Sequence, residues 1–307
     1  PHSPTLALGV RGTPGRNPPP EAKRGLGMVP PKRTARRKLV LDYKLVCLDI
    51  DGTLLDSENR IRPRVKEAVR AVRGLGIPVV LVSARGPGGI LFLYDQLEIA
   101  SPVICYNGAL ILDEDRSPVY SREISPAQAR QAEAIARDMG LHLSVYRNGR
   151  WYVGAADDWG AREGGITRMT PAITDLSALL EEWDRQGQGP HKLLCMARPG
   201  EILAIQARVG ALDLDVYRSM PIYLEMTAKG VSKSGAIDWL VRRLGIRPDQ
   251  VLAAGDNFND LPMLLYAGMG VAMGNAPGEV KARADDVTAA NDEDGVALAL
   301  EKHILGA

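Results

Sequence analysis

Short apolar runs alternate with helix-like patterns along the chain from residue 39 onward. Segments 44–50 and 77–82 are apolar runs with the length of buried strands. Between them, segment 63–74 has apolar residues at three- and four-residue spacing and a proline at its first position, which predicts an amphipathic helix. Strand, helix and strand in this order are typical of a parallel sheet with crossover helices. We therefore predict an α/β fold.

Polar turns follow three of the predicted strands. They are Asp49-Ile50-Asp51-Gly52-Thr53, Ser83-Ala84-Arg85-Gly86 and, after the apolar run 102–105, Tyr106-Asn107-Gly108. Open α/β sheets bind their ligands beyond the carboxyl ends of the parallel strands. The sequence thus predicts a polar site at that end of the sheet.

Residues 119–219 interrupt this order with a mixed pattern of their own. Segments 126–139 and 177–185 have helical spacing, whereas 142–146, 151–153, 192–196 and 214–218 have the character of strands. About a hundred residues with their own elements suggest an inserted domain. A helix at 232–244 and a strand at 251–254 then resume the first pattern. We predict one domain from residues 39–118 and 220–307, and an inserted α/β domain at 119–219.

Three of the four tryptophans, Trp151, Trp159 and Trp183, lie in the predicted insertion. We expect them to form its core, with the alternative that one of them stacks on a ring of the substrate.

The first 38 residues differ in composition from the rest. They hold nine Lys or Arg, one Glu and eight of the 21 prolines, without a periodic apolar pattern. Such a segment buries too little apolar surface to offset the entropy of ordering it, so we expect a disordered tail. A start at Met28 or an upstream remnant would explain the break in composition. Attraction of 32–38 to nucleic acid or a membrane is the alternative.

Charge and composition narrow the class of protein. The net charge of +1 divides into +8 in the tail and −7 in the remainder, which argues against nucleic acid as the substrate. With 45% hydrophobic and 24% charged residues the composition is that of an ordinary soluble protein, and no apolar stretch approaches the roughly 18 residues of a membrane span. Cys47, Cys105 and Cys195 are far apart and fit neither a disulfide framework nor a metal knuckle. We expect a soluble, cytoplasmic protein.

The acidic residues of the polar turns suggest phosphate chemistry. Asp49 and Asp51 can reach one site if their turn curls around it. A carboxylate that attacks a phosphate needs a cation, because both partners are anions, and Mg²⁺ takes oxygen ligands. Segment 256–260 supplies four oxygen-bearing side chains, on Asp256, Asn257, Asn259 and Asp260.

Other polar residues can support a transferring phosphoryl group. Lys233 would add a fixed positive charge, and the hydroxyls of Ser83 and Thr53 would donate hydrogen bonds. Asp51 can then protonate the leaving oxygen and later deprotonate the water that hydrolyses an aspartyl phosphate.

Four motifs make the chain resemble the haloacid dehalogenase superfamily of phosphohydrolases, specifically its Cof-type subgroup (subfamily IIB), over about residues 43–305. They are Asp49-Ile50-Asp51-Gly52-Thr53-Leu54; Ser83-Ala84-Arg85; Lys233 within 229–233; and Gly255-Asp256-Asn257-Phe258-Asn259-Asp260. The resemblance implies a Rossmann-like, doubly wound parallel sheet core with an inserted α/β cap domain at 119–219 that sets the substrate specificity.

The resemblance also implies a role for each motif residue. Asp49 would be the nucleophile and Asp51 the general acid/base, and Ser83 and Lys233 would contact the phosphoryl group as further catalytic residues. The implied Mg²⁺ ligands and neighbours are Asp49, the Asp51 carbonyl, Asp256 and Asp260. The implied substrate-binding positions are Gly52, Thr53, Ala84, Arg85, Asn107 and Asn259.

The second motif departs from the family pattern. Ala84 stands where the family usually has glycine, so a turn that needs a positive φ there would be strained. Ser83 keeps the hydroxyl of the usual threonine. Each motif alone has a plain structural interpretation, such as a helix cap for Ser83 or a solvated position for Lys233. Their joint occurrence at predicted strand ends favours phosphate chemistry.

We predict a Mg²⁺-dependent phosphatase that hydrolyses a small phosphorylated metabolite, either a sugar phosphate or a phosphorylated cofactor, through an aspartyl-phosphate intermediate. The acid/base at Asp51 favours this prediction, because ion-pumping relatives have threonine at this position. A phosphomutase resembling the phosphomannomutases and a noncatalytic binding protein with a vestigial site are the alternatives. We expect the metabolite as partner, no nucleic acid or membrane, and a monomeric or homodimeric chain.

Overall fold

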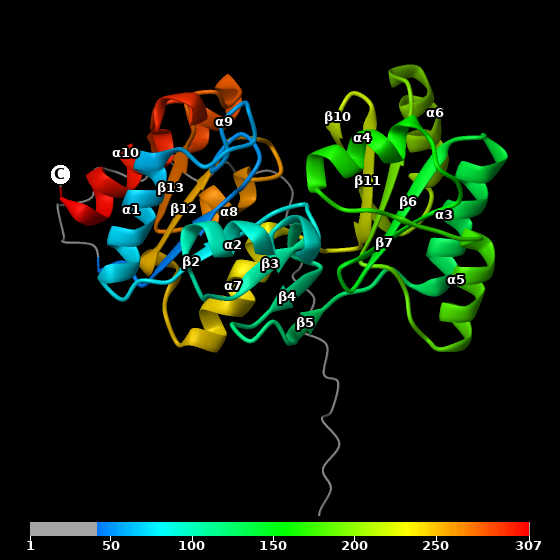
Figure 1. Ribbon diagram of the computed structural model, residues 1–307, viewed down its shortest axis with the longest axis horizontal. Helices are drawn as coiled ribbons and strands as arrows, with labels where there is room; N and C mark the ends of the chain where they lie inside the picture. Colours follow the sequence, from blue (N-terminus) through cyan, green and yellow to red (C-terminus); the bar gives the residue numbers. More distant parts are fainter. Residues whose placement is uncertain (1–41, 307) are drawn as a thin grey trace, which may run out of the picture. The chain divides into compact units, whose positions relative to one another are not determined.

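A parallel sheet lies at the centre of the part of the molecule that is built from residues before and after the insertion (Figure 1). The computed structural model describes residues 42–306, so the predicted tail at 1–38 lies outside the described residues. Five strands pair in the order β14-β13-β12-β1-β2, and every pair is parallel. Their bounds are β1 (Leu45–Leu48), β2 (Val79–Leu81), β12 (Val251–Gly255), β13 (Met269–Ala272) and β14 (Asp286–Val287). The order reverses between β1 and β12, which makes this the switch point of a doubly wound sheet.

Helices cover both faces of the five-stranded sheet because its strands are apolar on both sides. Side chains of β1 alternate between the faces. One buried cluster joins Val46 and Leu48 to α1 (Pro63–Gly74), α2 (Leu91–Leu97) and α10 (Gly295–Leu300). The other joins Leu45 and Cys47 to α7 (Lys233–Leu244), α8 (Leu261–Tyr266) and α9 (Gly278–Arg283). The predicted α/β fold and the helix at 63–74 are confirmed.

A small antiparallel sheet continues from the edge of the parallel one. It consists of β3 (Val103–Cys105), β4 (Leu110–Leu112) and β5 (Pro118–Ser121). A parallel bridge between Val82 and Ile104 places β3 beside β2, so the polar turn after β3 lies at the same end of the sheet as the turn after β2. Short 3₁₀ turns at 87–89, 106–108, 248–250 and 291–293 and a π-helix at 301–305 complete this part.

The insertion forms a separate sheet of six strands, in the order β10-β11-β9-β6-β7-β8. Its strand pairs are antiparallel except for β7 and β8, which are parallel. Their bounds are β6 (His142–Arg147), β7 (Arg150–Val153), β8 (Ala172–Ile173), β9 (Lys192–Met196), β10 (Leu214–Met220) and β11 (Tyr223–Ala228). The strand β11 follows residue 219, where we predicted that the insertion ends, and β5 pairs with β4 outside it. We therefore use the name inserted segment for residues 122–228. The strand β11 completes the hydrogen bonds of β9 and β10, and the predicted domain boundaries at residues 119 and 219 stay predictions.

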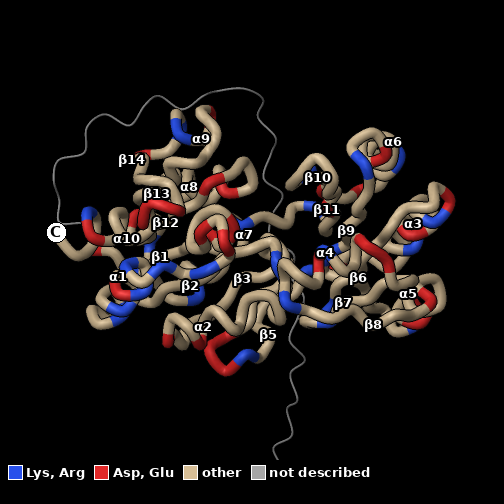
Figure 2. Tube along the Cα trace, turned by 45° about the horizontal axis from the view of Figure 1, so that its top comes forward, with Lys and Arg blue, Asp and Glu red and all other residues tan. Residues whose placement is uncertain are grey.

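Three helices of the inserted segment pack on one face of its sheet. They are α3 (Pro126–Asp138), α5 (Leu176–Arg185) and α6 (Pro199–Val209), and their apolar residues share a buried cluster with Leu193, Cys195 and Leu224. Lys and Arg positions lie among Asp and Glu positions along α3 and α6, as Figure 2 shows. Arg130 of α3 pairs with Asp184 of α5 at 3.0 Å. This ion pair connects α3 with α5.

The helix α4 (Asp158–Thr167) does not follow from the sequence pattern. It contains Gly160, Gly164 and Gly165, which lower helix propensity by about 1 kcal/mol each relative to alanine. Packing overrides this cost, because Gly164 lies against the carbonyl of Met169 and the ring of Trp151, where a larger residue would collide. Among the helices in residues 42–306, none has the length and apolar character that crossing a membrane requires.

His191 is buried between the inserted segment and the three-stranded sheet. Its Nδ1 accepts a hydrogen bond from the main-chain N–H of Asn148 at 3.3 Å, and its Nε2 lies 3.0 Å from Oγ of Ser121 in β5. Its ring stacks on Tyr106 with the centroids 5.5 Å apart. Burial, assisted by Arg147 and opposed by Glu123, lowers the pKa of His191 from 6.5 to about 4.

We expect this histidine to make the protein less stable in acid. The unfolded chain binds a proton at His191 below pH 6.5, whereas the folded chain binds it only near pH 4. The free energy of unfolding should therefore fall as the pH drops through this window, by up to about 3 kcal/mol. Urea unfolding at a series of pH values measures this fall, and His191→Gln, which keeps one donor and one acceptor, should have a shallower profile. Parallel profiles for both proteins would contradict the assignment.

Candidate active site

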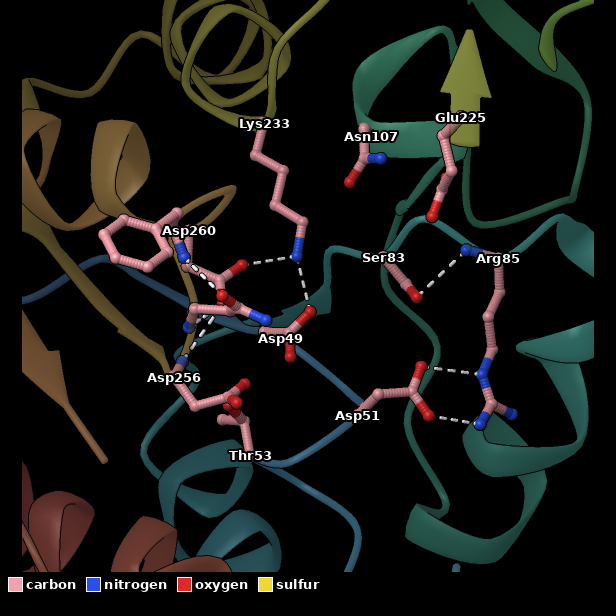
Figure 3. Close-up of polar contacts among 12 residues, drawn as sticks. Asp49, Asp51, Thr53, Ser83, Arg85, Asn107, Glu225, Lys233, Asp256 and Asp260 are labelled. Atoms are coloured by element: carbon pink, nitrogen blue, oxygen red, sulfur yellow. Dashed lines mark hydrogen bonds and ion pairs between the residues drawn. The ribbon is translucent and has the colours of Figure 1, made fainter. Parts of the chain in front are cut away.

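Three carboxylates meet beyond the carboxyl ends of β1 and β12 (Figure 3). Asp49 directly follows β1, Asp256 directly follows β12, and Asp260 precedes α8. The parallel pairing holds the two strand ends together, since the N–H of Asp49 donates to the carbonyl of Ala254 at 3.0 Å. One oxygen from each of the three carboxylates lies within 4.8 Å of the others. The cluster thus lies at the switch point of the sheet.

The ammonium of Lys233 lies between two of these carboxylates. Its Nζ donates to Oδ1 of Asp49 at 2.5 Å and to Oδ1 of Asp260 at 2.6 Å, and the side chain is 1% exposed. Lys233 is the first residue of α7, whose N-terminus is capped by the hydroxyl of Ser232. The other oxygen of Asp260 accepts main-chain N–H groups of Asp256 and Asn257, at 3.0 and 2.9 Å. Asp260 therefore holds both Lys233 and the turn after β12.

The charges at this site do not balance. Burial, and then the charge of Asp260, raise the pKa of Asp49 well above its usual value, against the opposing effect of Lys233. Burial and Asp260 likewise raise the pKa of Asp256 to about 6. Burial opposes the charge of Lys233, but Asp260 and Asp49 outweigh it and raise the pKa of this lysine. Three carboxylates facing one ammonium, two of them buried and that of Asp256 partly buried, fit a divalent cation that takes oxygen ligands, such as Mg²⁺.

Gly52 allows the turn after β1 to pass close to Asp256. Its φ is +79°, and a Cβ at this position would lie 2.5 Å from Oδ2 of Asp256. The next residue, Thr53, is buried and donates from Oγ1 to Oδ1 of Asp256 at 3.1 Å. Gly52 and Thr53 thus fix the position of the Asp256 carboxylate.

The turn after β2 presents a buried hydroxyl. Oγ of Ser83 accepts the main-chain N–H of Arg85 at 3.1 Å, and Ser83 is 1% exposed. Ala84 does not have a positive φ. The turn therefore does not require the positive φ under which alanine would be strained at this position.

Asp51 turns away from the other carboxylates toward Arg85 (Figure 3). The guanidinium of Arg85 donates to both oxygens of Asp51, from Nε to Oδ2 at 2.9 Å and from Nη2 to Oδ1. Arg85 is buried and also donates to the carbonyl of Gly89 at 3.3 Å, whereas the side chain of Asp51 is 51% exposed. The carboxylate cluster therefore does not include the Asp51 side chain.

A cavity of about 250 Å³ lies over the carboxylates and the Ser83 turn. Eight of the predicted site residues line it, namely Asp49, Asp51, Ser83, Ala84, Arg85, Asp256, Asn259 and Asp260. Four others do not line it but contact residues that do, namely Gly52, Thr53, Asn107 and Lys233. The structure thus brings the predicted residues together, and their individual roles stay predictions.

The inserted segment supplies cavity residues that the sequence analysis missed. They include Glu163 from α4, Lys192 from β9, and Tyr223 and Glu225 from β11. Both Lys192 and Glu225 are less than a tenth exposed, although they lie in otherwise apolar strands. A charged residue in a buried strand is a signal that could have identified both. None of the four tryptophans, all within residues 42–306, lines the cavity, so the cavity gives no support to stacking of the substrate on tryptophan.

Comparisons with known proteins agree on one family. A family model of haloacid dehalogenase-like hydrolases matches residues 46–300. A Haemophilus influenzae protein with a provisional phosphatase name is 36% identical over 264 residues, which are 85% of this chain and 98% of that protein. A pyridoxal phosphate phosphatase of Escherichia coli is 28% identical over 275 residues, 85% of this chain and 99% of its own. A crystal structure of a haloacid dehalogenase-like hydrolase from Bacteroides thetaiotaomicron aligns with a TM-score of 0.77 at 30% identity, covering 85% and 99% of the two chains.

Gly52 provides a test of the cation site. In Gly52→Ala the new Cβ would displace the Asp256 carboxylate, so we expect the affinity for Mg²⁺, measured by calorimetry, to fall about tenfold or more. Gly76→Ala is the matched control, because Gly76 has a φ of +77° and a Cβ added there would have no atom within 4 Å. Both variants should lose about 1 kcal/mol of stability from the backbone conformation. Equal Mg²⁺ affinity in the two variants would contradict the proposed geometry.

Proposed function

The chain belongs to the haloacid dehalogenase-like hydrolases and is a phosphatase, and we propose that it hydrolyses a small phosphorylated metabolite through an aspartyl phosphate on Asp49. The observation that carries the proposal is the meeting of Asp49, Asp256 and Lys233 beneath a cavity at the switch point of the sheet. Lys233 bonds Oδ1 of Asp49, which leaves Oδ2 for attack on phosphorus.

In the first step Oδ2 of Asp49 forms a bond to phosphorus while the bond from phosphorus to the leaving oxygen breaks. Lys233 and the Ser83 hydroxyl are close enough to Asp49 and the cavity to stabilise the phosphoryl oxygens. A proton from Asp51 converts the leaving oxygen into an alcohol. Asp51 lines the cavity beside Arg85, so it can reach a leaving group that fills this space.

In the second step water attacks the phosphorus of the aspartyl phosphate. Asp51 takes a proton from the water, the bond between phosphorus and the Asp49 oxygen breaks, and inorganic phosphate leaves. Asp49 is thereby restored as a carboxylate and Asp51 as an acid. One residue thus acts once as an acid and once as a base, which balances the protons over the cycle.

Asp49 and Asp256, with the main-chain carbonyl of Asp51, would hold Mg²⁺, and this ion supplies the positive charge that offsets the repulsion between nucleophile and phosphate. Asp260 contributes indirectly. Both of its oxygens already accept hydrogen bonds, so it orients Lys233 and the turn that carries Asp256.

The substrate is proposed to be a small metabolite, either a sugar phosphate or a phosphorylated cofactor. A cavity of about 250 Å³ supports a phosphate with a small leaving group. Its walls from the inserted segment carry a carboxyl group on Glu163 and a hydroxyl group on Tyr223, which can hydrogen-bond a polar leaving group. The Escherichia coli relative named for pyridoxal phosphate supports a phosphorylated cofactor as one candidate.

Asp49→Asn tests the nucleophile. The amide is a poor nucleophile of nearly the same shape, so release of inorganic phosphate from a panel of phosphorylated metabolites with Mg²⁺ should fall at least about a thousandfold. Asp95→Asn, on the exposed side of α2, is the control and should retain the parent rate. Parent activity in Asp49→Asn would refute the mechanism, and an isomeric phosphate ester in place of free phosphate would identify a mutase.

Asp51→Asn separates the two steps. The p-nitrophenolate group leaves without a proton, so p-nitrophenyl phosphate should still phosphorylate the variant, whereas water attack loses its base. Rapid mixing should therefore show a burst of one p-nitrophenolate per protein molecule, followed by turnover about a hundredfold or more slower than that of the parent. A steady state from the first moment, at the parent rate, would exclude Asp51 as the base.

A further inference from the structure

Each carbonyl of the Ser83–Arg85 turn has a different hydrogen-bond donor. The N–H of Asn107 donates to the carbonyl of Ser83 at 2.8 Å, and the N–H of Tyr106 donates to that of Arg85 at 2.9 Å. The carbonyl of Ala84, between them, accepts from Nζ of Lys192 at 3.1 Å. The first two donors belong to the chain after β3, whereas Lys192 belongs to the inserted segment. The turn therefore depends on both parts of the molecule.

The position of Lys192 is fixed by the six-stranded sheet. Lys192 and Leu194 project from the same face of β9, and Glu225 on β11 lies opposite Leu194 in the register. This brings Oε2 of Glu225 to 3.0 Å from Nζ of Lys192, and both side chains are about 95% buried. The ammonium also lies 5.3 Å from the centroid of the Tyr146 ring. Burial acts to raise the pKa of Glu225, but Lys192 and neighbouring hydroxyls outweigh it and lower this pKa.

A second chain of hydrogen bonds begins at Glu225. The hydroxyl of Tyr217, opposite Glu225 on β10, donates to Oε2 at 2.8 Å, and Nδ2 of Asn107 donates to the oxygen of Tyr217. Both bonds run toward Glu225, whose oxygen is the final acceptor. Asn107 in turn holds the carbonyl of Ser83 through its main chain. Glu225 is thus connected to two successive carbonyls of the turn, to that of Ala84 through Lys192 and to that of Ser83 through Tyr217 and Asn107. Figure 3 shows Asn107 and Glu225 near Ser83 and Arg85.

We propose that Lys192 and Glu225 are positioning residues of the phosphate site, through which the inserted segment holds the Ser83–Arg85 turn in its working geometry. The proposal rests on the proposed function, in which Ser83 contacts the phosphoryl group. That group is common to all substrates. Loss of Lys192 should therefore weaken phosphate binding and slow turnover by the same factor for every leaving group. A residue that binds the leaving group would instead change the order of preference among substrates.

The test compares Lys192→Met with the parent in two measurements. Calorimetry with inorganic phosphate and Mg²⁺ should show an affinity about tenfold lower, and this readout needs no turnover. The kcat/KM for p-nitrophenyl phosphate and for a hexose phosphate should fall by the same factor, on the order of tenfold to a hundredfold. Lys192→Arg keeps a cation and a donor and should recover part of the loss. Lys302→Met, which removes a surface pair with Asp286, is the control and should match the parent.

Folding of the variant needs its own control. Lys192→Met leaves Glu225 as an unpaired buried charge, which can destabilise the protein. The double variant Lys192→Met/Glu225→Gln leaves no buried charge at this pair and still lacks the donor to Ala84, so it should show the same losses while folded.

Three outcomes would overturn the proposal: unchanged phosphate affinity in the folded double variant, factors for the two substrates that differ tenfold or more, or no recovery with arginine. Failure of the proposed function would give a different result. In that case the parent would release no phosphate, or Asp49→Asn would release it at the parent rate. The affinities of the Lys192 variants for inorganic phosphate would still test whether Lys192 holds the Ser83–Arg85 turn.

Discussion

Repulsion between three carboxylates at close range, two of them buried and one partly buried, is the constraint on which this site depends. Asp49, Asp256 and Asp260 place oxygens within 4.8 Å of one another, and Lys233 is the ammonium that bonds two of them. An arrangement of this kind is costly for a folded protein, because each buried carboxylate loses its hydration. The same deficit of positive charge makes the site attractive to a divalent cation, and in the proposed mechanism Asp49 is the nucleophile of this site. The site thus lowers the stability of the fold, and in the proposed mechanism this cost accompanies the reactivity of Asp49.

The doubly wound sheet explains why these groups can meet at all. Asp49 and Asp256 are far apart in the sequence, but β1 and β12 are neighbouring parallel strands. Their carboxyl ends therefore lie side by side at one edge of the sheet. The turns then leave in different directions, and the space between them is open to a ligand. Lys233 reaches this space from the first turn of α7, on the other side of the inserted segment in the sequence. The fold therefore assembles the site from elements on both sides of the insertion.

Much of this arrangement could be predicted from the sequence because the motifs are local. Each polar turn follows an apolar run, and the alternation of strands and helices places the ends of parallel strands together. The pairing of Asp51 with Arg85, the contact of Gly52 with Asp256 and the roles of Lys192 and Glu225 depend on distances between segments that are remote in the sequence. No periodicity encodes such distances. The strand β11 is difficult to assign from the sequence for the same reason, since it is recognised by its partners β9 and β10. The glycines of α4 concealed a helix that only packing stabilises.

The bond from Lys192 to the Ala84 carbonyl limits how freely the two parts of the molecule can be recombined. If the inserted segment were only a lid that selects substrates, an engineer could replace it with the corresponding segment of a relative and obtain a new preference. Because a cation at the start of β9 completes the turn after β2, a transplanted segment must bring its own donor to that point. Chimaeras without such a donor would have the substrate preference of the transplanted segment but a lower rate of catalysis. An engineer would therefore have to select for the contact with the turn together with the new substrate preference.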